Sequence, residues 1–233
     1  MEFGPGIVQA DDFLTPAECA EISRKVLSLE KHWEPRLGPY RFATLGCAAY
    51  LDGEGDYGEK AAALNELMRD TFQETYEKVR IYFESILEGE VYYDEAYAYP
   101  GFHLFHFDGQ EISRDRPADR AHFDYQFAKV FPNFASTTAL PITFTIPVEE
   151  PSTGSSLEMW ELRPEGHAEL GYEHKEYAHS TPSKTVPYAL GRIFSHDGLN
   201  LHAMGQIPAG TTGRRMTLQG HAFRTERGWQ LYW

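Results

Sequence analysis

Apolar side chains recur at steps of three and four residues through residues 58–87, and this spacing predicts a long amphipathic helix with one buried face. A shorter helix is predicted over residues 16–29, because Thr15 and Glu18 form a capping-box sequence and a proline follows Thr15. Between the two helices, residues 40–51 carry only a weak strand pattern. We therefore expect residues 1–90 to be mainly helical.

The pattern then changes to short runs of valine, isoleucine, threonine and aromatic residues, separated by glycine, proline and aspartate. Strands are predicted over residues 91–99, 102–107, 121–130, 138–148, 156–162, 191–195 and 216–223. Many short strands are typical of a β-sandwich or barrel. Residues 1–233 are therefore predicted to form a single α+β domain, in which residues 1–90 support a β core formed by residues 91–233.

The composition supports one sizeable hydrophobic core, since 42% of the 233 residues are apolar. The formal net charge is −14 and no basic cluster is present, so nucleic acid is not an expected partner. No apolar run approaches the roughly 20 residues that cross a bilayer, and the first residues lack a signal-peptide pattern. We expect a cytoplasmic protein whose two cysteines, Cys19 and Cys47, are reduced and buried.

Two residues of metal-binding type, His122 and Asp124, are two positions apart in the predicted strand 121–130. On a strand these side chains point to the same face. His202, which ends an apolar run, is the best candidate for a third ligand from a distant strand. Two histidines and one carboxylate hold non-haem Fe(II) while leaving coordination positions open. We therefore predict a metal site formed by these three residues.

An arginine is predicted to point into the β core. Met216 and Leu218 alternate with polar residues, so Arg215 lies on the polar face of its strand, together with residues 217, 219 and 221. A buried guanidinium needs an anion, and a carboxylate fits it in a bidentate way. The anion is either a bound ligand or an Asp or Glu of the protein. Arg214 takes this role if the strand register differs by one residue.

Several segments, in a fixed order, resemble those of the Fe(II)/2-oxoglutarate-dependent oxygenases. They are residues 121–125 (AHFDY), 141–148 (PITFTIPV), 154–158 (GSSLE), His202 and residues 213–218 (GRRMTL). The resemblance implies a double-stranded β-helix (jelly-roll, cupin-like) core. It also implies that His122, Asp124 and His202 are the catalytic Fe(II) ligands and that Arg215 anchors 2-oxoglutarate. The reaction would consume O2 and release succinate and CO2.

A second HFD tripeptide, at residues 106–108, competes with the one at residues 122–124. We prefer the later copy, because the strand pattern continues after it, whereas a polar loop follows the earlier copy. His106 and Asp108 then either border the pocket or sit at an exposed strand end. His196 competes with His202 but lies within a turn pattern, so a loop position is expected for it.

Residues 99–105, 217–221 and 228–233 look similar to the small oxygenases that hydroxylate or chlorinate free amino acids without a carrier protein. The chlorinating members replace the ligand carboxylate by Gly or Ala. Asp124 is present here, so the resemblance implies hydroxylation. We expect a small-molecule substrate such as a free amino acid, including a cationic one. The candidate substrate contacts are His106, Asp108, Glu158 and Trp233.

The polar, histidine-rich residues 163–187 are predicted to form a lid over the site, the alternative being a surface excursion far from it. Two other functions stay open. One is a cupin-like metal- or sugar-binding barrel that uses no oxygen, for which an inward Arg215 has no role. The other is a radical halogenase of the same superfamily. A homodimer is compatible with the sequence, and no membrane association is expected.

Overall fold

The computed structural model describes residues 8–36, 41–109, 116–131, 141–164 and 173–233, with the backbone alone for residues 53–56. Within this part of the chain the strands form two sheets. The large sheet contains β1 (Val8–Asp12), β2 (Glu34–Arg36), β3 (Arg41–Leu45), β4 (Val91–Tyr93), β5 (Gly101–Asp108), β6 (Ile142–Glu149), β9 (Arg192–Asp197), β11 (Thr212–Arg224) and β12 (Trp229–Tyr232). The small sheet contains β7 (Ser156–Met159), β8 (Lys184–Pro187) and β10 (His202–Met204).

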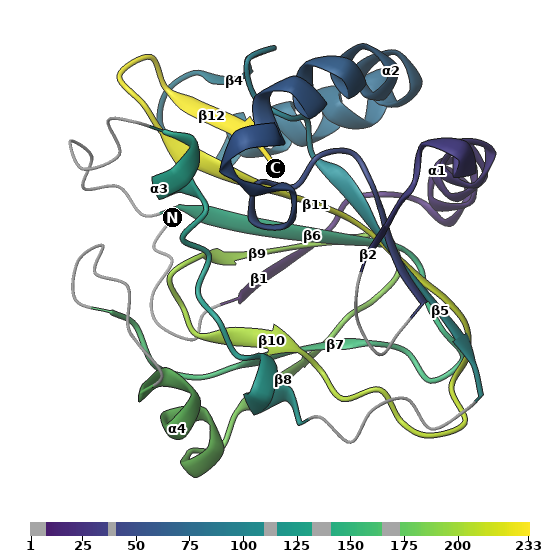
Figure 1. Ribbon diagram of the computed structural model, residues 1–233, viewed down its shortest axis with the longest axis vertical. Helices are drawn as coiled ribbons and strands as arrows, with labels where there is room; N and C mark the ends of the chain where they lie inside the picture. Colours follow the sequence, from purple (N-terminus) through teal and green to yellow (C-terminus); the bar gives the residue numbers. More distant parts are fainter. Residues whose placement is uncertain (1–7, 37–40, 110–115, 132–140, 165–172) are drawn as a thin grey trace.

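The large sheet runs in the order β1-β9-β6-β11-β5-β3-β2 through antiparallel pairs. Two long helices, α1 (Pro16–Ser28) and α2 (Ala49–Ile86), cover one face of it, while the small sheet lies on the opposite side (Figure 1). Shorter helical segments are η1 (Glu30–His32), η2 (Pro117–Arg120), α3 (Phe127–Val130) and α4 (Glu173–Ser180). Two facing sheets of antiparallel strands are the jelly-roll arrangement, and the predicted fold class is confirmed.

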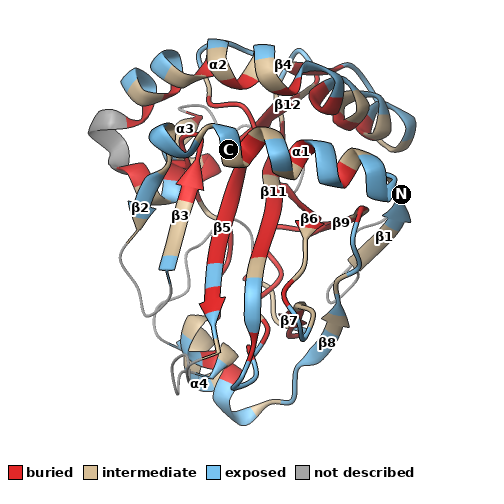
Figure 2. Cartoon of the chain, turned by 90° about the vertical axis from the view of Figure 1, so that its right-hand side faces the viewer, coloured by how far each residue is buried: buried red, intermediate tan, exposed pale blue. Residues whose placement is uncertain are grey.

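The main hydrophobic core fills the space between the helices and the large sheet. Val79 and Phe83 of α2 are fully buried and belong to one cluster with Phe144 of β6 and with Met216 and Leu218 of β11. Figure 2 shows the buried sides of both helices turned toward the sheet. Because side chains alternate along a strand, these apolar residues send their polar neighbours to the other face, toward the small sheet.

The capping box predicted for the first helix is confirmed. The Thr15 hydroxyl accepts a hydrogen bond from the Glu18 backbone N–H at 3.3 Å, and the Glu18 carboxylate accepts one from the Thr15 N–H at 2.8 Å. The second helix begins at Ala49, nine residues before its predicted start. It thereby includes the end of the weak strand pattern at residues 40–51, whose first half forms β3.

Most predicted strands are present, but the one predicted over residues 121–130 is wrong. That segment is extended only around a single bridge from His122 to His202, and α3 follows it. The strand expected at 91–99 is limited to β4, and part of the one expected at 138–148 lies outside the described residues. The sequence pattern missed β1, β2, β8, β10 and β12, which are short or follow no clear alternation.

The described part of the predicted lid, residues 163–187, contains α4 and β8. Residues 165–172 lie outside the described part of the chain. Both cysteines are buried free thiols, as predicted. No helix in the described part of the chain has both the length and the apolar character of a membrane span.

Gly101 is required by close packing at the start of β5. A Cβ atom there would lie 2.0 Å from the Trp233 ring and 2.7 Å from the Leu45 carbonyl oxygen. We therefore expect Gly101→Ala to destabilise the fold by about 1–3 kcal/mol. Gly58→Ala is the matched control, because nothing lies within 4 Å of its Cβ position in α2, and it should stabilise by about 0.5–1 kcal/mol. Urea unfolding of both variants tests this, and equal stabilities would contradict the packing argument.

Candidate metal centre

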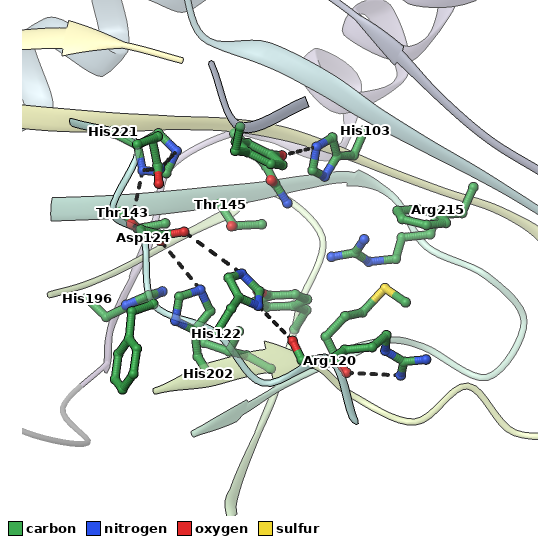
Figure 3. A pocket seen from close by; sticks show the side chains of 18 of the residues that line it. His103, Arg120, His122, Asp124, Thr143, Thr145, His196, His202, Arg215 and His221 are labelled. Atoms are coloured by element: carbon green, nitrogen blue, oxygen red, sulfur yellow. Dashed lines mark hydrogen bonds and ion pairs between the residues drawn. The ribbon is translucent and has the colours of Figure 1, made fainter. Parts of the chain in front are cut away.

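A cavity of about 340 Å³ lies between the two sheets (Figure 3). Its walls come from β3, β5, β6, β9 and β11 of the large sheet and from β7 and β10 of the small sheet. Polar residues that line it include His122, Asp124, Thr143, His202, Arg215 and His221. A concave space with a few converging polar groups is the usual form of a small-molecule site.

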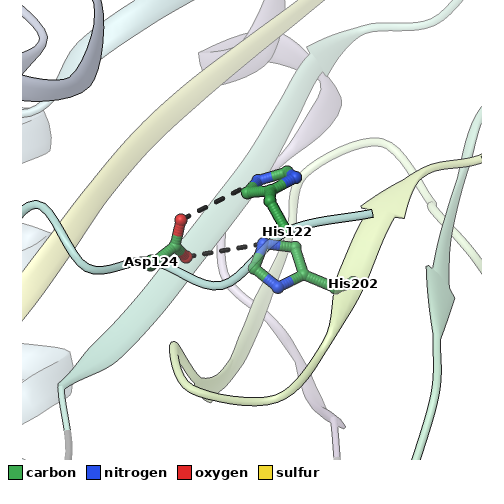
Figure 4. A group of neighbouring side chains, drawn as sticks. All are labelled: His122, Asp124 and His202. Atoms are coloured by element: carbon green, nitrogen blue, oxygen red, sulfur yellow. Dashed lines mark ion pairs between the residues drawn. The ribbon is translucent and has the colours of Figure 1, made fainter. Parts of the chain in front are cut away.

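His122, Asp124 and His202 meet at one end of this cavity, as the sequence predicted (Figure 4). His122 and His202 are bridge partners: each N–H donates to the other's carbonyl oxygen, at 2.9 and 3.0 Å. The Asp124 N–H donates to the Gly198 carbonyl oxygen at 2.9 Å. Backbone pairing between two segments far apart in the sequence therefore brings these side chains together.

The three side chains present their ligand atoms to a common point. Asp124 Oδ2 lies 3.4 Å from His202 Nε2, and Asp124 Oδ1 lies 3.9 Å from His122 Nε2. One ligand atom from each residue lies within 4.8 Å of the other two. Asp124 and His202 are buried, whereas the His122 side chain is 55% exposed. The group is therefore accessible from the cavity.

Backbone carbonyl groups fix the orientation of both imidazoles. His122 Nδ1 lies 2.8 Å from the Arg120 carbonyl oxygen, and His202 Nδ1 lies 2.8 Å from the Asn200 carbonyl oxygen. A carbonyl oxygen only accepts, so each Nδ1 carries the proton and donates it. Each Nε2 is then left as the electron-pair donor that faces Asp124, which is the tautomer that a metal ligand needs.

Burial keeps the surrounding histidines neutral. It lowers the pKa of His202 to about 3, and it lowers the pKa of His196 and of His221 to about 4. Burial alone would raise the pKa of Asp124, but the neighbouring imidazoles and the Thr143 hydroxyl hold that pKa below its ordinary value. The site therefore combines the Asp124 carboxylate with a neutral His202 imidazole at pH 7, which are the forms that bind a divalent cation.

Arg215 lines the cavity, and its side chain is 3% exposed. Its guanidinium lies 5.3 Å from the ring centroid of Phe105 and 5.7 Å from that of Tyr188. Its Nε has no hydrogen-bond partner, and no described carboxylate lies within salt-bridge distance. Burial lowers its pKa, although Tyr188 and the more distant Glu150 favour the charged form. A buried cation with unused donors is suited to a bound anion.

These residues fit the metal and the co-substrate that the sequence implies. Two imidazoles and a carboxylate form the donor set that holds Fe(II) in a facial arrangement. The orphaned Nε of Arg215 fits the carboxylate of a dicarboxylic acid in the same cavity. A candidate set of metal ligands and a candidate anion-binding arginine thus line the same cavity.

Arg214 points to the other face of β11. It pairs with Glu149 at 3.1 Å, and its side chain is 41% exposed. His106 and Asp108 share that face of β5 with the core residue Leu104; both are exposed, and neither lines the cavity. The expectation that they border the pocket is therefore not supported, and the strand-end alternative describes them.

Glu158 and Trp233 are also placed away from the cavity. On β7, Leu157 lines the cavity, while Glu158 points the opposite way and accepts hydrogen bonds from Ser183 and Thr185 at 2.6 and 3.0 Å. Trp233 is fully buried and packs against His103, with 5.4 Å between ring centroids. It supports a cavity residue from behind instead of contacting a substrate.

His196 is not a loop residue, contrary to the prediction. It lies on β9 opposite Thr143, is 3% exposed and lines the cavity beside His202. The sequence pattern also missed Tyr50, whose hydroxyl lies 2.5 Å from His103 Nε2 in the wall of the cavity. His103 alternates with Phe102 and Leu104, so the strand pattern contained the signal that places it on the cavity face.

No family model and no curated protein matches the sequence. Solved structures do match. An N-substituted L-amino acid dioxygenase from Burkholderia ambifaria AMMD, in complex with alpha-ketoglutarate, has a TM-score of 0.54 and 16% identity over 97% of this chain and 85% of that chain. The non-haem alpha-ketoglutarate-dependent epimerase SnoN from nogalamycin biosynthesis has a TM-score of 0.54 and 15% identity over 95% of this chain and 81% of that chain.

SnoN in complex with Fe3+, alpha-ketoglutarate and nogalamycin RO matches with a TM-score of 0.51 and 12% identity, over 97% of this chain and 94% of that chain. At such low identity the likeness is one of fold. The chain therefore has the cupin-like double-stranded β-helix fold of these proteins, which the order of its motifs had implied.

The buried histidines predict how stability depends on pH. Their folded-state pKa values, about 3 for His202 and about 4 for His196 and His221, lie below the ordinary histidine value of 6.5. The unfolded chain therefore binds more protons between about pH 6.5 and pH 4, and stability falls as the pH is lowered through this window. The loss at pH 5 should be on the order of 2 kcal/mol or less per histidine.

Urea unfolding of the metal-stripped protein at pH 7.5 and pH 5 measures this loss, and His196→Asn should make it smaller by removing one of the three groups. A stability that stays constant or rises toward pH 5 would contradict the assignment of these histidines as buried and neutral.

Proposed function

We propose that this protein is an Fe(II)- and 2-oxoglutarate-dependent dioxygenase that hydroxylates an unactivated C–H bond of a small polar substrate, such as a free amino acid. One observation carries the proposal: a two-histidine, one-carboxylate group and a buried arginine without a carboxylate partner among the described residues line the same cavity. The fold neighbours support it, since their names describe an amino acid dioxygenase and an alpha-ketoglutarate-dependent epimerase.

In this proposal His122, Asp124 and His202 hold the metal, and Arg215 binds the distal carboxylate of 2-oxoglutarate. The bound iron supplies oxidative chemistry with O2, in which 2-oxoglutarate is converted to succinate and CO2. The protein's own part is positioning. The imidazoles of His122 and His202 offer their Nε2 electron pairs, and the aromatic rings of Phe105 and Tyr188 keep the guanidinium of Arg215 away from water.

The charges of the cavity bear on the substrate. Among the described residues that line it, Asp124 is the only carboxylate, whereas Arg120 and Arg215 are both cations. A cationic side chain loses support, because Asp108 and Glu158 do not line this space.

A cupin-like barrel that uses no oxygen is the competing function. It has no need for a buried arginine opposite its metal, and such a residue would only destabilise it. Anaerobic addition of Fe(II) and 2-oxoglutarate separates the two. The oxygenase gives a metal-to-ligand charge-transfer band in the visible spectrum, whereas a barrel that binds Fe(II) without the band would refute the proposal. Substrate-dependent succinate formation with a panel of free amino acids then identifies the substrate.

The metal ligands can be tested against the second HFD tripeptide. His122→Ala removes an electron pair that faces Asp124 and should weaken Fe(II) binding to the metal-stripped protein by at least an order of magnitude. A residue that binds the metal directly matters more than the residues that only orient such ligands, and losing one of those already changes affinity about 10–100-fold. His106→Ala is the matched control, since His106 is exposed on the other face of β5. Iron loss in the His106 variant alone would reverse the assignment.

Arg215 and Arg214 form a second matched pair. Truncation of one partner of a buried charge pair costs about 2–5 kcal/mol, so Arg215→Ala should raise the 2-oxoglutarate concentration that half-saturates the charge-transfer band by roughly 30-fold or more. Arg214→Ala breaks only a half-exposed pair with Glu149 and should leave this concentration nearly unchanged. A larger defect in the Arg214 variant would show that the wrong arginine has been assigned.

The presence of Asp124 predicts hydroxylation in place of chlorination. Its carboxylate faces both histidines and repels a second anion from the position that it occupies. The unmodified protein should therefore give a hydroxylated product even in high chloride. Mass spectrometry of the product from an accepted substrate tests this, and a chlorinated product would favour the halogenase alternative.

A further inference from the structure

The Asp124 carboxylate belongs to a hydrogen-bond chain that lies in the wall of the cavity. Thr143 Oγ1 lies 2.5 Å from Asp124 Oδ2, and His221 Nδ1 lies 3.1 Å from the same Thr143 oxygen. Gln126 Nε2 lies 2.7 Å from His221 Nε2 and 3.1 Å from His221 Nδ1. All four residues are buried, with exposed fractions of 4–8%. These interactions connect the metal-binding segment to strands β6 and β11 of the large sheet.

The chemistry of each group fixes the direction of this chain. An ionised carboxylate only accepts, so the Thr143 hydroxyl donates to Asp124. That hydroxyl has used its one proton, so its oxygen accepts from His221 Nδ1, which must carry the proton. The other ring nitrogen of this neutral imidazole then accepts from the Gln126 amide, which is a donor at its nitrogen. Along the chain from Gln126 through His221 to Thr143, each hydrogen-bond donor therefore points toward Asp124.

Thr143 donates a side-chain hydrogen bond to the Asp124 carboxylate. Asp124 itself lies on an irregular segment, where its backbone N–H donates to the Gly198 carbonyl oxygen. His122 and His202, in contrast, are bridge partners whose rings are oriented by carbonyl groups of their own segments. Without Thr143, the carboxylate is free to turn about its side-chain bonds.

The hydrogen bond between Thr143 and Asp124 is closely surrounded by other atoms. A Cβ atom at Gly198 would lie 2.9 Å from Thr143 Oγ1 and 3.2 Å from Asp124 Cβ. A glycine at this position thus leaves space for the threonine hydroxyl to reach the carboxylate. The surroundings of Asp124 are built around this hydrogen bond.

We propose that Thr143, His221 and Gln126 are positioning residues that hold the Asp124 carboxylate in the orientation in which it faces both histidines, and so preorganise the metal site. This inference rests on the proposed function, because it treats Asp124 as a metal ligand. It goes beyond that function in assigning roles to three residues that do not touch the metal. Partners that orient metal ligands typically change metal affinity by about 10–100-fold when they are removed.

The experiment measures Co(II) binding to the metal-stripped protein, without co-substrate or turnover. Thr143→Val keeps the shape of the side chain and removes the hydroxyl, and it should weaken Co(II) binding by about 10–100-fold. It should also alter the visible absorption of bound Co(II), which depends on ligand geometry. Thr143→Ser restores the hydroxyl and should recover most of the affinity. Thr145→Val, the same change two residues along the same face of β6, should leave Co(II) affinity unchanged.

Thermal unfolding of each metal-free variant separates a structural effect from a positioning effect. A role in stability alone lowers the melting temperature but leaves the Co(II) affinity and spectrum of the folded protein unchanged. If Thr143→Val does not fold, His221→Phe removes the next link and should weaken Co(II) binding in the same direction. In the double variant the two losses should not add, because both substitutions break one chain.

The outcomes distinguish this inference from the function on which it rests. A wild-type protein that binds no Co(II) or Fe(II) overturns the proposed function and this inference together. Wild-type binding with an unaffected Thr143→Val variant overturns the positioning role alone, as does a loss in Thr143→Val that Thr143→Ser does not recover. Fully additive losses in the double variant would show that His221 acts independently of Thr143.

Discussion

The central strands β5, β6 and β11 of the large sheet have two faces, and their side chains point alternately to the helices and to the cavity. Phe102, Phe144 and Leu218 fill the core beneath α1 and α2. Their alternation turns the residues between them toward the small sheet, where Thr143 and Arg215 line the cavity. The packing of an apolar face thus determines which polar groups form the site, and a shift of one residue would exchange the two sets.

The same rule explains how much of the site was predictable from the sequence. Arg215 lies on the cavity face, as predicted, because it alternates with the apolar residues Met216 and Leu218. His106 lies two residues after Leu104 and therefore on the same, helix-facing side of β5. This position on the strand is a stronger argument against a metal site at the second HFD tripeptide than the loop that follows the tripeptide. Local alternation carries this information wherever one face of a strand is strongly apolar.

Other features depend on pairing between distant segments, which a local pattern does not contain. His122 and Asp124 lie together without the predicted strand, because backbone bonds to residues 198–202 hold them. His196 follows a turn-like sequence, yet β9 extends through it by pairing with both β1 and β6. Trp233 is buried because β12 joins β11 and β4. In each case tertiary contacts override the local preference.

The polar groups of the cavity are costly to the fold, which argues that they are retained for binding. A buried guanidinium whose Nε has no partner and several buried imidazoles all favour exposure to water, and apolar residues of similar size would pack at lower cost. The hydrogen-bond chain that runs from Gln126 through His221 and Thr143 to Asp124 gives these buried polar groups partners. Arg215 Nε, in contrast, remains an unused donor. Conflicts of this kind between stability and sequence are expected at functional sites. Here the costly polar groups lie at the two ends of the cavity, where a metal and a dicarboxylate would give them partners.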